Sequence, residues 1–190
     1  MPRRAGLTHT VVVNAAIELI NQDGAGQLSL AALAQKLNVR SPSLYNHING
    51  LDGLRRDITL VGLRQLTAAL QTAVMGRAGF EALASLAQAY RHFALSQPGL
   101  YALTLRSTEQ DDPELQQAGR DAVAVVLAAL RGYGLEGDAA LHATRCLRSA
   151  LHGFVSLEMA GGFALTLDLD ESFGHLLRTL DCGLTSGFGR

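Results

Sequence analysis

The stretch from Ser29 to Ile48 constrains the fold of this sequence more than any other feature. Apolar side chains recur three and four residues apart through its first half, and Ser29 is placed to cap the helix they predict. Asn38 follows, where a helix that ends in the left-handed conformation needs Gly or Asn. Ser41 and Pro42 then start another helix, with the serine as its cap and proline at the first helical position. Two short helices joined by a turn of roughly three or four residues have the spacing of a helix-turn-helix.

The remainder of the chain shows the same helical periodicity, with Gly, Pro and Asp clusters as breaks. Thr8 is placed to cap the first helix. No segment alternates as a strand does, so the sequence predicts an all-α protein of about nine helices. We expect an N-terminal three-helix head over residues 1–50 and a helical-bundle body over residues 51–190. The predicted helices span residues 8–22, 30–37, 41–48, 51–75, 80–96, 99–106, 113–133, 138–160 and 171–187.

Composition narrows the class of protein. Hydrophobic residues make up 48% of the 190 residues, enough for a packed core, yet no uninterrupted apolar stretch is long enough to span a bilayer or to form a signal peptide. We therefore expect a cytoplasmic protein. Cys146 and Cys182 do not have the spacing of metal ligands, so we expect reduced, buried thiols, no metal site and no cofactor.

Charge is unevenly distributed along the chain. Residues 1–66 carry seven basic and four acidic side chains, a net charge of +3, whereas the remainder carries nine basic and thirteen acidic side chains, a net charge of −4. A basic head on an acidic body suits a protein whose head meets phosphate, although a difference of this size also arises by chance.

The third predicted helix has polar side chains that packing does not explain. Leu44 and Ile48 are four residues apart and should face inward. The outward positions carry hydrogen-bonding groups of the kind that phosphates and base edges need. These positions are Ser43, Tyr45, Asn46 and His47. The alternative is that they only face solvent on a small helical bundle.

The run from Leu30 to Ile48 resembles the tetracycline-repressor-like (TetR) family, above all in Leu44-Tyr45-x-His47-Ile48. Weaker marks of one branch of the family follow in the body: His92-Phe93-Ala94, Pro98 to Tyr101, Leu151 to Glu158 with its His152-Gly153-Phe154, and Phe163. The resemblance implies a dimeric transcriptional regulator, by default a repressor, whose third helix enters the major groove of double-stranded DNA and whose body often encloses a small-molecule inducer.

The resemblance also implies individual DNA contacts. It assigns Arg40, Ser41, Ser43, Tyr45 and His47 to the DNA surface. It places Ser29 near phosphate at a helix start and makes Arg3 and Arg4 a basic arm, although a solvated tail is the alternative for that arm. Two positions depart from the family: Asn38 stands where Gly is usual, and Leu51 stands where many members have a lysine that contacts phosphate. Arg55 and Arg56 are the candidates to replace that lysine.

Two clusters in the body are candidates for a ligand site. Aromatic and apolar residues gather around a helix break, where pockets often form, although ordinary core packing also explains them. Polar residues form a stripe on the helix predicted over residues 138–160. This stripe would line a ligand cavity, lie at a dimer interface or face solvent. If it lines a cavity, its arginines would favour an anionic ligand. The candidate ligand-binding residues are Tyr90, Phe93, Tyr101, Leu105, Arg145, Arg148 and His152, with His142 on the same stripe.

The last two predicted helices have more apolar surface than a small body obviously needs to bury. We therefore expect them to pack against a second copy as a four-helix interface with twofold symmetry, so that two heads read a near-palindromic site. The predicted interface residues are Leu147, Leu151, Phe154, Val155, Leu176, Leu177 and Leu180.

Two other classes of function stay open. No nucleophile elbow, phosphate-binding loop or paired metal-binding histidines occur, which leaves an all-α enzyme with an unrecognised site as the less favoured alternative. A helical protein-interaction module, or a regulator without DNA affinity, is the other, because Leu51 and the near-neutral net charge weaken the case for DNA.

Overall fold

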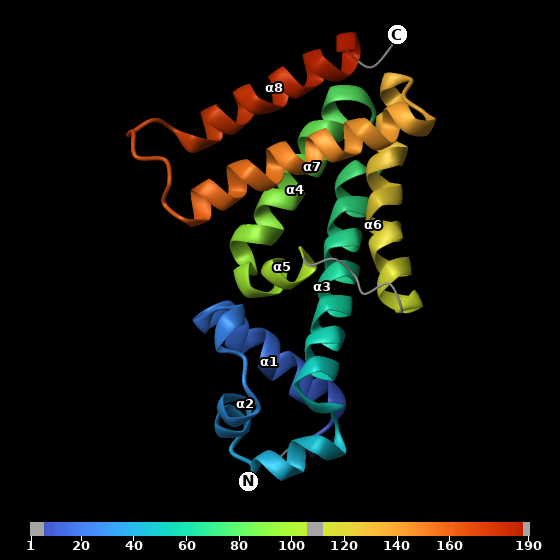
Figure 1. Ribbon diagram of the computed structural model, residues 1–190. Helices are drawn as coiled ribbons and strands as arrows, with labels where there is room; N and C mark the ends of the chain where they lie inside the picture. The colour runs from blue at the N-terminus through green and yellow to red at the C-terminus, as the bar shows by residue number, and fades with distance from the viewer. Residues whose placement is uncertain (1–5, 106–111, 188–190) are drawn as a thin grey trace. The chain divides into compact units, whose positions relative to one another are not determined.

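The computed structural model describes residues 6–105 and 112–187, and within them the chain is all-α with no strand (Figure 1). This confirms the predicted fold class. Eight α-helices and three short 3-10 helices occur in the described residues; the helix η2 takes the place of the third predicted helix and completes the nine expected. The α-helices are α1 (His9–Asp23), α2 (Leu30–Leu37), α3 (Gly50–Val74), α4 (Gly79–Ser96), α5 (Pro98–Thr104), α6 (Pro113–Leu130), α7 (Gly137–Met159) and α8 (Leu169–Gly187). The 3-10 helices are η1 (Ala25–Gln27), η2 (Ser41–Asn46) and η3 (Arg131–Tyr133).

The chain divides into two compact units. The first contains residues 1–64 and 97–116, and the second contains residues 65–96 and 117–190. Helix α3 therefore contributes residues to both units, as does α6. These geometric units are not the head and body expected at residue 50, which describe a division of function and stay a prediction.

In the first unit, local hydrogen bonds begin and end the helices as the sequence predicts. Thr8 accepts from the backbone N–H of Val11 (3.3 Å), and Ser29 accepts from that of Ala32 (3.2 Å). Asn38 is left-handed (φ 53°, ψ 48°), and its N–H bonds to the carbonyls that end α2. The core between these helices is fully enclosed. It contains Val12, Ile20, Leu33, Leu44, Leu54 and Ile58.

The start of α5 lies directly against α1 within the same unit. A Cβ atom at Gly99 would stand 2.0 Å from the carbonyl oxygen of Ile20, so only glycine allows this approach. One residue on, the side chain of Asn21 accepts a hydrogen bond from the backbone N–H of Leu100 (3.0 Å). The side chain of Asn21, on α1, thus satisfies a backbone N–H group at the start of α5 that has no partner within its own helix.

The segment from Ser41 to Asn46 differs from its prediction. It is a 3-10 helix that follows Arg40, and no side chain caps it, so the expected cap by Ser41 is wrong. The N–H of Ser43 bonds to the carbonyl of Arg40, three residues back, and that of His47 bonds to Leu44 in the same way. The segment has six residues, and its proline donates no backbone hydrogen bond. It therefore forms the tighter 3-10 helix, which is common in helical segments of this length.

In the second unit, α4 packs against both α7 and α8, which also contact each other. The buried stripe of α7 points into this core, while Phe173 and Leu177 bring α8 to it. One part of the core joins α4, α6, α7 and α8 through Leu83, Leu130, Leu135, Ala140, Ala143, Leu147 and Leu184. None of the helices in the described ranges is both long and apolar enough to cross a membrane.

A buried arginine lies between α4, α7 and α8. Arg91 is 8% exposed and bonds through two nitrogens to both carboxylate oxygens of Glu158 (2.7 and 2.6 Å) and through a third to Asp170 (2.6 Å). Its guanidinium also lies over the rings of Phe154 and Phe173, at 5.8 and 5.0 Å from their centroids. The hydrogen bonds to Glu158 hold the pKa of Arg91 above its ordinary value, so the charge is permanent.

Both cysteines lie on the surface. Cys146 on α7 and Cys182 on α8 are free and exposed, so the expectation that they are buried is wrong. Each belongs to a helix whose apolar stripe faces the core, and each falls outside that stripe.

Candidate DNA-binding surface

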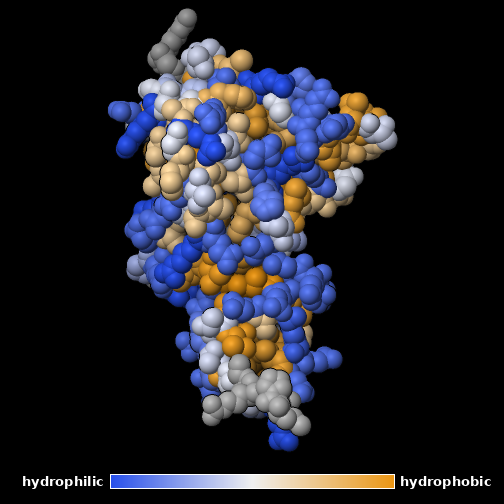
Figure 2. All heavy atoms as spheres, turned by 180° about the vertical axis from the view of Figure 1, so that it is seen from behind, coloured by the Kyte–Doolittle hydropathy of each residue, from blue (hydrophilic) through white to orange (hydrophobic). Residues whose placement is uncertain are grey.

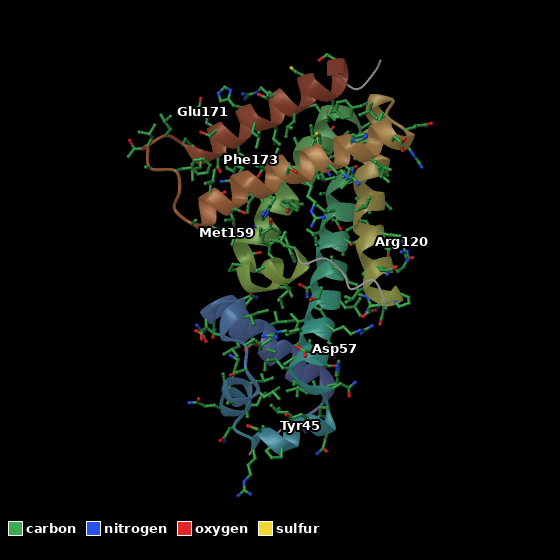
Figure 3. The ribbon with its side chains drawn as sticks, viewed as in Figure 1. Tyr45, Asp57, Arg120, Met159, Glu171 and Phe173 are labelled. Atoms are coloured by element: carbon green, nitrogen blue, oxygen red, sulfur yellow. The ribbon has the colours of Figure 1, made fainter. Side chains whose placement is uncertain are left out.

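The helix η2 presents polar side chains outward because two apolar side chains hold it to the core. Leu44 is fully buried and Ile48 is 4% exposed. Tyr45 lies between them and is 61% exposed (Figure 3). Asn46 is also exposed, whereas Ser43 and His47 are half-buried. The end of this short helix and the residue that follows it therefore carry an aromatic hydroxyl, an amide and an imidazole at three successive positions.

The residues around η2 complete the candidate surface. Arg40 is exposed in the turn and Ser41 is half-buried at the start of η2. Ser29 uses its hydroxyl as the cap of α2, so any phosphate near it would meet a helix start whose N–H groups are partly satisfied. Arg3 and Arg4 lie outside the described residues, and their contact stays a prediction.

Several contacts hold the turn in place. The N–H of Val39 bonds to the carbonyl of Ala34 (3.0 Å), which closes the turn after α2. Lys36 on α2 pairs with Glu18 on α1 at 3.2 Å. The imidazole of His9 lies 2.8 Å from a carboxylate oxygen of Asp57, which links α1 to α3. The turn and both helices are thus fixed from several sides, as a surface that reads DNA requires.

The departure at Leu51 leaves Arg55 as the available cation at the start of α3. Arg55 makes only a long contact to Asp52 (3.5 Å). Arg56 is engaged elsewhere, by Asp112 (2.5 and 3.0 Å) and Glu114 (2.8 Å). The bond to Asp112 is the main cause that raises the pKa of Arg56, and the same bond lowers the pKa of Asp112.

Sequence reasoning missed this ion cluster and the one at Arg91. Arg56 is 56 residues from Asp112 in the chain, and Arg91 is 67 residues from Glu158. Helical periodicity relates residues three and four apart, so it carries no signal for such pairs. Among the described residues, no group of three or more His, Cys, Asp or Glu side chains is arranged to hold a metal ion.

The predicted ligand-binding residues do not gather within one unit. Tyr101 and Leu105 belong to the first unit, and Tyr90 and Phe93 belong to the second, where both are buried. The other three lie along α7. Arg145 and Arg148 are exposed, and His152 is half-buried beside the hydroxyl of Ser156 (3.3 Å). The two arginines of the polar stripe are thus exposed within their unit, and the ligand site expected along the stripe stays a prediction.

The predicted dimer residues divide into two groups. Leu147, Leu151, Val155 and Leu177 are at most 3% exposed and pack inside the chain's own core, which removes them from any interface. The remaining three, Phe154, Leu176 and Leu180, are half-buried. The ring of Phe154 packs against the rings of Phe163 and Phe173 in tilted arrangements, with both ring centroids 4.9 Å away. Of the predicted interface residues, only these three thus keep surface outside the chain's own core.

Comparison with known proteins agrees with the motif and the fold. The family model of the tetracyclin repressor-like C-terminal domain matches residues 83–180. The chain is 41% identical over 184 residues to YobS, an uncharacterized helix-turn-helix-type transcriptional regulator of Bacillus subtilis, with 97% of this chain and 96% of that protein covered. It is 38% identical to a second uncharacterized regulator of this type, from Mycobacterium tuberculosis, with 96% and 84% covered.

Solved structures show the same arrangement of helices. A Rhodococcus protein of unknown function superposes with a TM-score of 0.83 at 25% identity, with 98% of this chain and all of that chain covered. ActR of Streptomyces coelicolor superposes with a TM-score of 0.67 at 22% identity, with 97% and 98% covered, and at that identity shows the fold alone. The chain therefore belongs to the TetR family of DNA-binding helix-turn-helix transcriptional regulators.

Proposed function

We propose that the protein is a ligand-controlled repressor that binds a near-palindromic operator as a homodimer, with η2 in the major groove. The exposed Tyr45 between the buried Leu44 and Ile48 carries this proposal, because a large aromatic side chain held in water by its neighbours has no packing role. Ser43, Tyr45, Asn46 and His47 contact base edges and phosphate, while Arg40, Arg55 and the arm with Arg3 and Arg4 contact the backbone.

Control by a small molecule follows from the family. A structural neighbour, ActR of Streptomyces coelicolor, is described in complex with actinorhodin (TM-score 0.69, 20% identity). For the present chain, a ligand that favours one arrangement of the two heads shifts the population of DNA-competent dimers. Helix α3 supplies residues to both compact units and follows the candidate DNA-binding surface directly in the chain, so it is a covalent connection that such a change would use. The protein acts by binding rather than catalysis, and in the cytoplasm, where its DNA is.

Fluorescence anisotropy with labelled DNA from upstream of its own gene tests the proposal. We expect affinity to fall steeply with salt, because phosphate contacts release counterions. Replacing Tyr45 by Ala should weaken binding by about tenfold or more if the hydroxyl or ring meets a base, an energy of about 1–3 kcal/mol. Phe80→Ala is the matched control, because Phe80 is an exposed aromatic residue of the second unit (43%) and outside the candidate surface.

Four results would count against the proposal. An affinity that does not change with salt, or an equal loss for Tyr45→Ala and Phe80→Ala, would mean that η2 does not read DNA. No binding to any fragment from the gene's surroundings would favour the protein-interaction module. DNA affinity that every bound effector leaves unchanged would remove the ligand control.

A further inference from the structure

The link between α7 and α8, residues 160–168, and the last turn of α7 have large apolar side chains in water. Leu165 and Leu167 are 78% and 72% exposed, and Leu157 and Met159 at the end of α7 are 50% and 41% exposed. We call these four residues the apolar patch. Figure 2 shows this end of the second unit at the right edge, where hydrophobic side chains gather. Four such residues within one short segment mark an interaction site more often than a scattered exposed leucine does.

One buried cation holds both ends of the link. Arg91 bonds through two nitrogens to Glu158 at the end of α7 and through a third to Asp170 at the start of α8. Within the link, the ring of Phe163 packs against the ring of Phe154 on α7, with their centroids 4.9 Å apart. The link is therefore attached to its own unit at its two ends and near its middle.

Local hydrogen bonds fix the backbone at the same two ends. The left-handed Gly161 and the bond from the N–H of Gly162 to the carbonyl of Leu157 (2.7 Å) end α7. A side-chain oxygen of Asp168 accepts from the N–H of Asp170 (2.7 Å) at the start of α8. A segment whose backbone is already fixed loses little conformational freedom when it binds, so association at the apolar patch costs less.

The charges around the apolar patch have one sign. No lysine or arginine occurs from residue 149 to residue 177, whereas this span contains four acidic residues: Glu158, Asp168, Asp170 and Glu171. Within the described ranges, Arg91 is the arginine that pairs with two of them. Glu171 is 74% exposed and makes only a 3.8 Å contact to His175. Figure 3 labels Met159 and Glu171 at the two ends of the link. The apolar patch thus has a negatively charged rim.

We propose that the apolar patch docks a basic amphipathic segment of another protein. An apolar centre inside a polar rim is the usual arrangement of a protein–protein interface. In an amphipathic helix, the apolar side chains on one side would cover the leucines of the link. Lysines or arginines beside them would pair with Glu171 and Asp168.

Charge argues against the other occupants. Nucleic acid and the anionic surface of a membrane would bring negative charge to a negative rim. The apolar patch of a second copy would bring the same acids opposite their own kind, which opposes association. A protein docked here gives the regulator an input separate from DNA and from a small-molecule effector. The inference therefore goes beyond the proposed function and does not rest on it.

Two synthetic peptides test the charge complementarity. One is an amphipathic helix of Leu and Lys with its leucines on one side, and in the other Glu replaces every Lys. In fluorescence anisotropy with the full-length chain, the Lys peptide should bind at least about tenfold more tightly than the Glu peptide and should lose affinity as salt rises. Equal affinity for the two peptides, or an affinity for the Lys peptide that salt leaves unchanged, would overturn the proposal.

Variants of the chain place the binding at the link. Leu165→Ser with Leu167→Ser should weaken binding of the Lys peptide by about tenfold or more, because a few central apolar residues carry most of the affinity of an interface. Glu171→Lys should weaken it by about threefold or more, because it reverses a charge of the rim. Leu95→Ser on α4 and Glu136→Lys just before α7 are the matched controls, since both residues are exposed and lie outside the link. Equal losses for the link variants and their controls would contradict docking at the link.

The same leucine variant distinguishes the other occupants. Its helical circular dichroism, its sedimentation equilibrium and its affinity for DNA that the unmodified chain binds should all be unchanged, since neither leucine packs in the core. A weaker dimer or weaker DNA binding would assign the apolar patch to a second copy and overturn the proposal. Phosphatidylcholine vesicles that bind the unmodified chain but not the variant would assign it to a membrane, with the same consequence.

Discussion

Gly99 gives the sharpest test of the packing between α1 and α5. We expect Gly99→Ala to destabilise the first unit, although alanine is the better helix former by about 1 kcal/mol. The added Cβ would stand 2.0 Å from the carbonyl oxygen and 2.3 Å from the carbonyl carbon of Ile20, and 2.8 Å from the backbone N of Asn21. All three atoms belong to the backbone, so no side chain can rotate away and one helix must move.

The magnitude follows from what that movement breaks. Forcing an extra carbon into a packed core costs about 1–3 kcal/mol. Displacing α5 also lengthens the bond from Leu100 N–H to Asn21, and a buried donor left without its partner costs about 1–3 kcal/mol. After the gain in helix propensity of about 1 kcal/mol, a net loss of about 1–5 kcal/mol remains, which corresponds to a fall in Tm of about 2–20 °C for a chain of this size.

Thermal and urea unfolding followed by far-ultraviolet circular dichroism measure this loss. Gly119→Ala is the matched control, because it makes the same change inside α6 where a Cβ would meet nothing within 4 Å. It should stabilise the protein by up to about 1 kcal/mol. The two changes thus have opposite expected signs. A Gly99→Ala protein as stable as the unmodified chain would refute the close approach of α5 to α1.

Three further predictions concern the turn and the two ion clusters. Asn38→Ala should cost about 1 kcal/mol in urea unfolding, because alanine pays the full steric cost of the left-handed region, whereas Asn38→Gly should stay within about 0.5 kcal/mol. Arg91→Met should cost about 3–5 kcal/mol, because it leaves the nearly buried Glu158 without its cation, and the additional change Glu158→Met should recover most of that loss; a double variant as weak as the single would contradict this. Asp112 has its pKa lowered, mainly by the hydrogen bond from Arg56, so its contribution to stability is present above its unfolded pKa and is lost as the pH falls through and below about 4. Unfolding curves at successive pH values should therefore converge for the unmodified protein and Asp112→Asn on acidification, and a constant difference would exclude the pair as the cause.

The head was largely predictable because its signals are local. The caps at Thr8 and Ser29 and the left-handed Asn38 each depend on hydrogen bonds that span five residues or fewer. Such bonds form wherever the right side chain stands at the right position, whatever the rest of the chain does. The prediction failed at Ser41, where the length of the helix decided between the α and 3-10 forms.

The body was less predictable because its packing joins distant residues. Helical periodicity identified the apolar stripes of α7 and α8 correctly. It could not say what covers them, and Leu147, Leu151, Val155 and Leu177 pack in the chain's own core. Arg91 forms ion pairs with two carboxylates on other helices. The spacing of residues in the sequence gives no sign of these pairs.

Most of the helix-turn-helix was thus determined by the sequence itself: the helix α2, the turn at Asn38 and the outward direction of Tyr45. Only the tertiary structure decided which cations stay available for phosphate, since Arg56 is held by Asp112 while Arg55 is not, and which surface of α7 and α8 remains for a partner. The physical reason is the separation along the chain over which each interaction acts. Capping and periodicity act within a few residues, whereas burial and ion pairing depend on side chains that only the folded chain brings together.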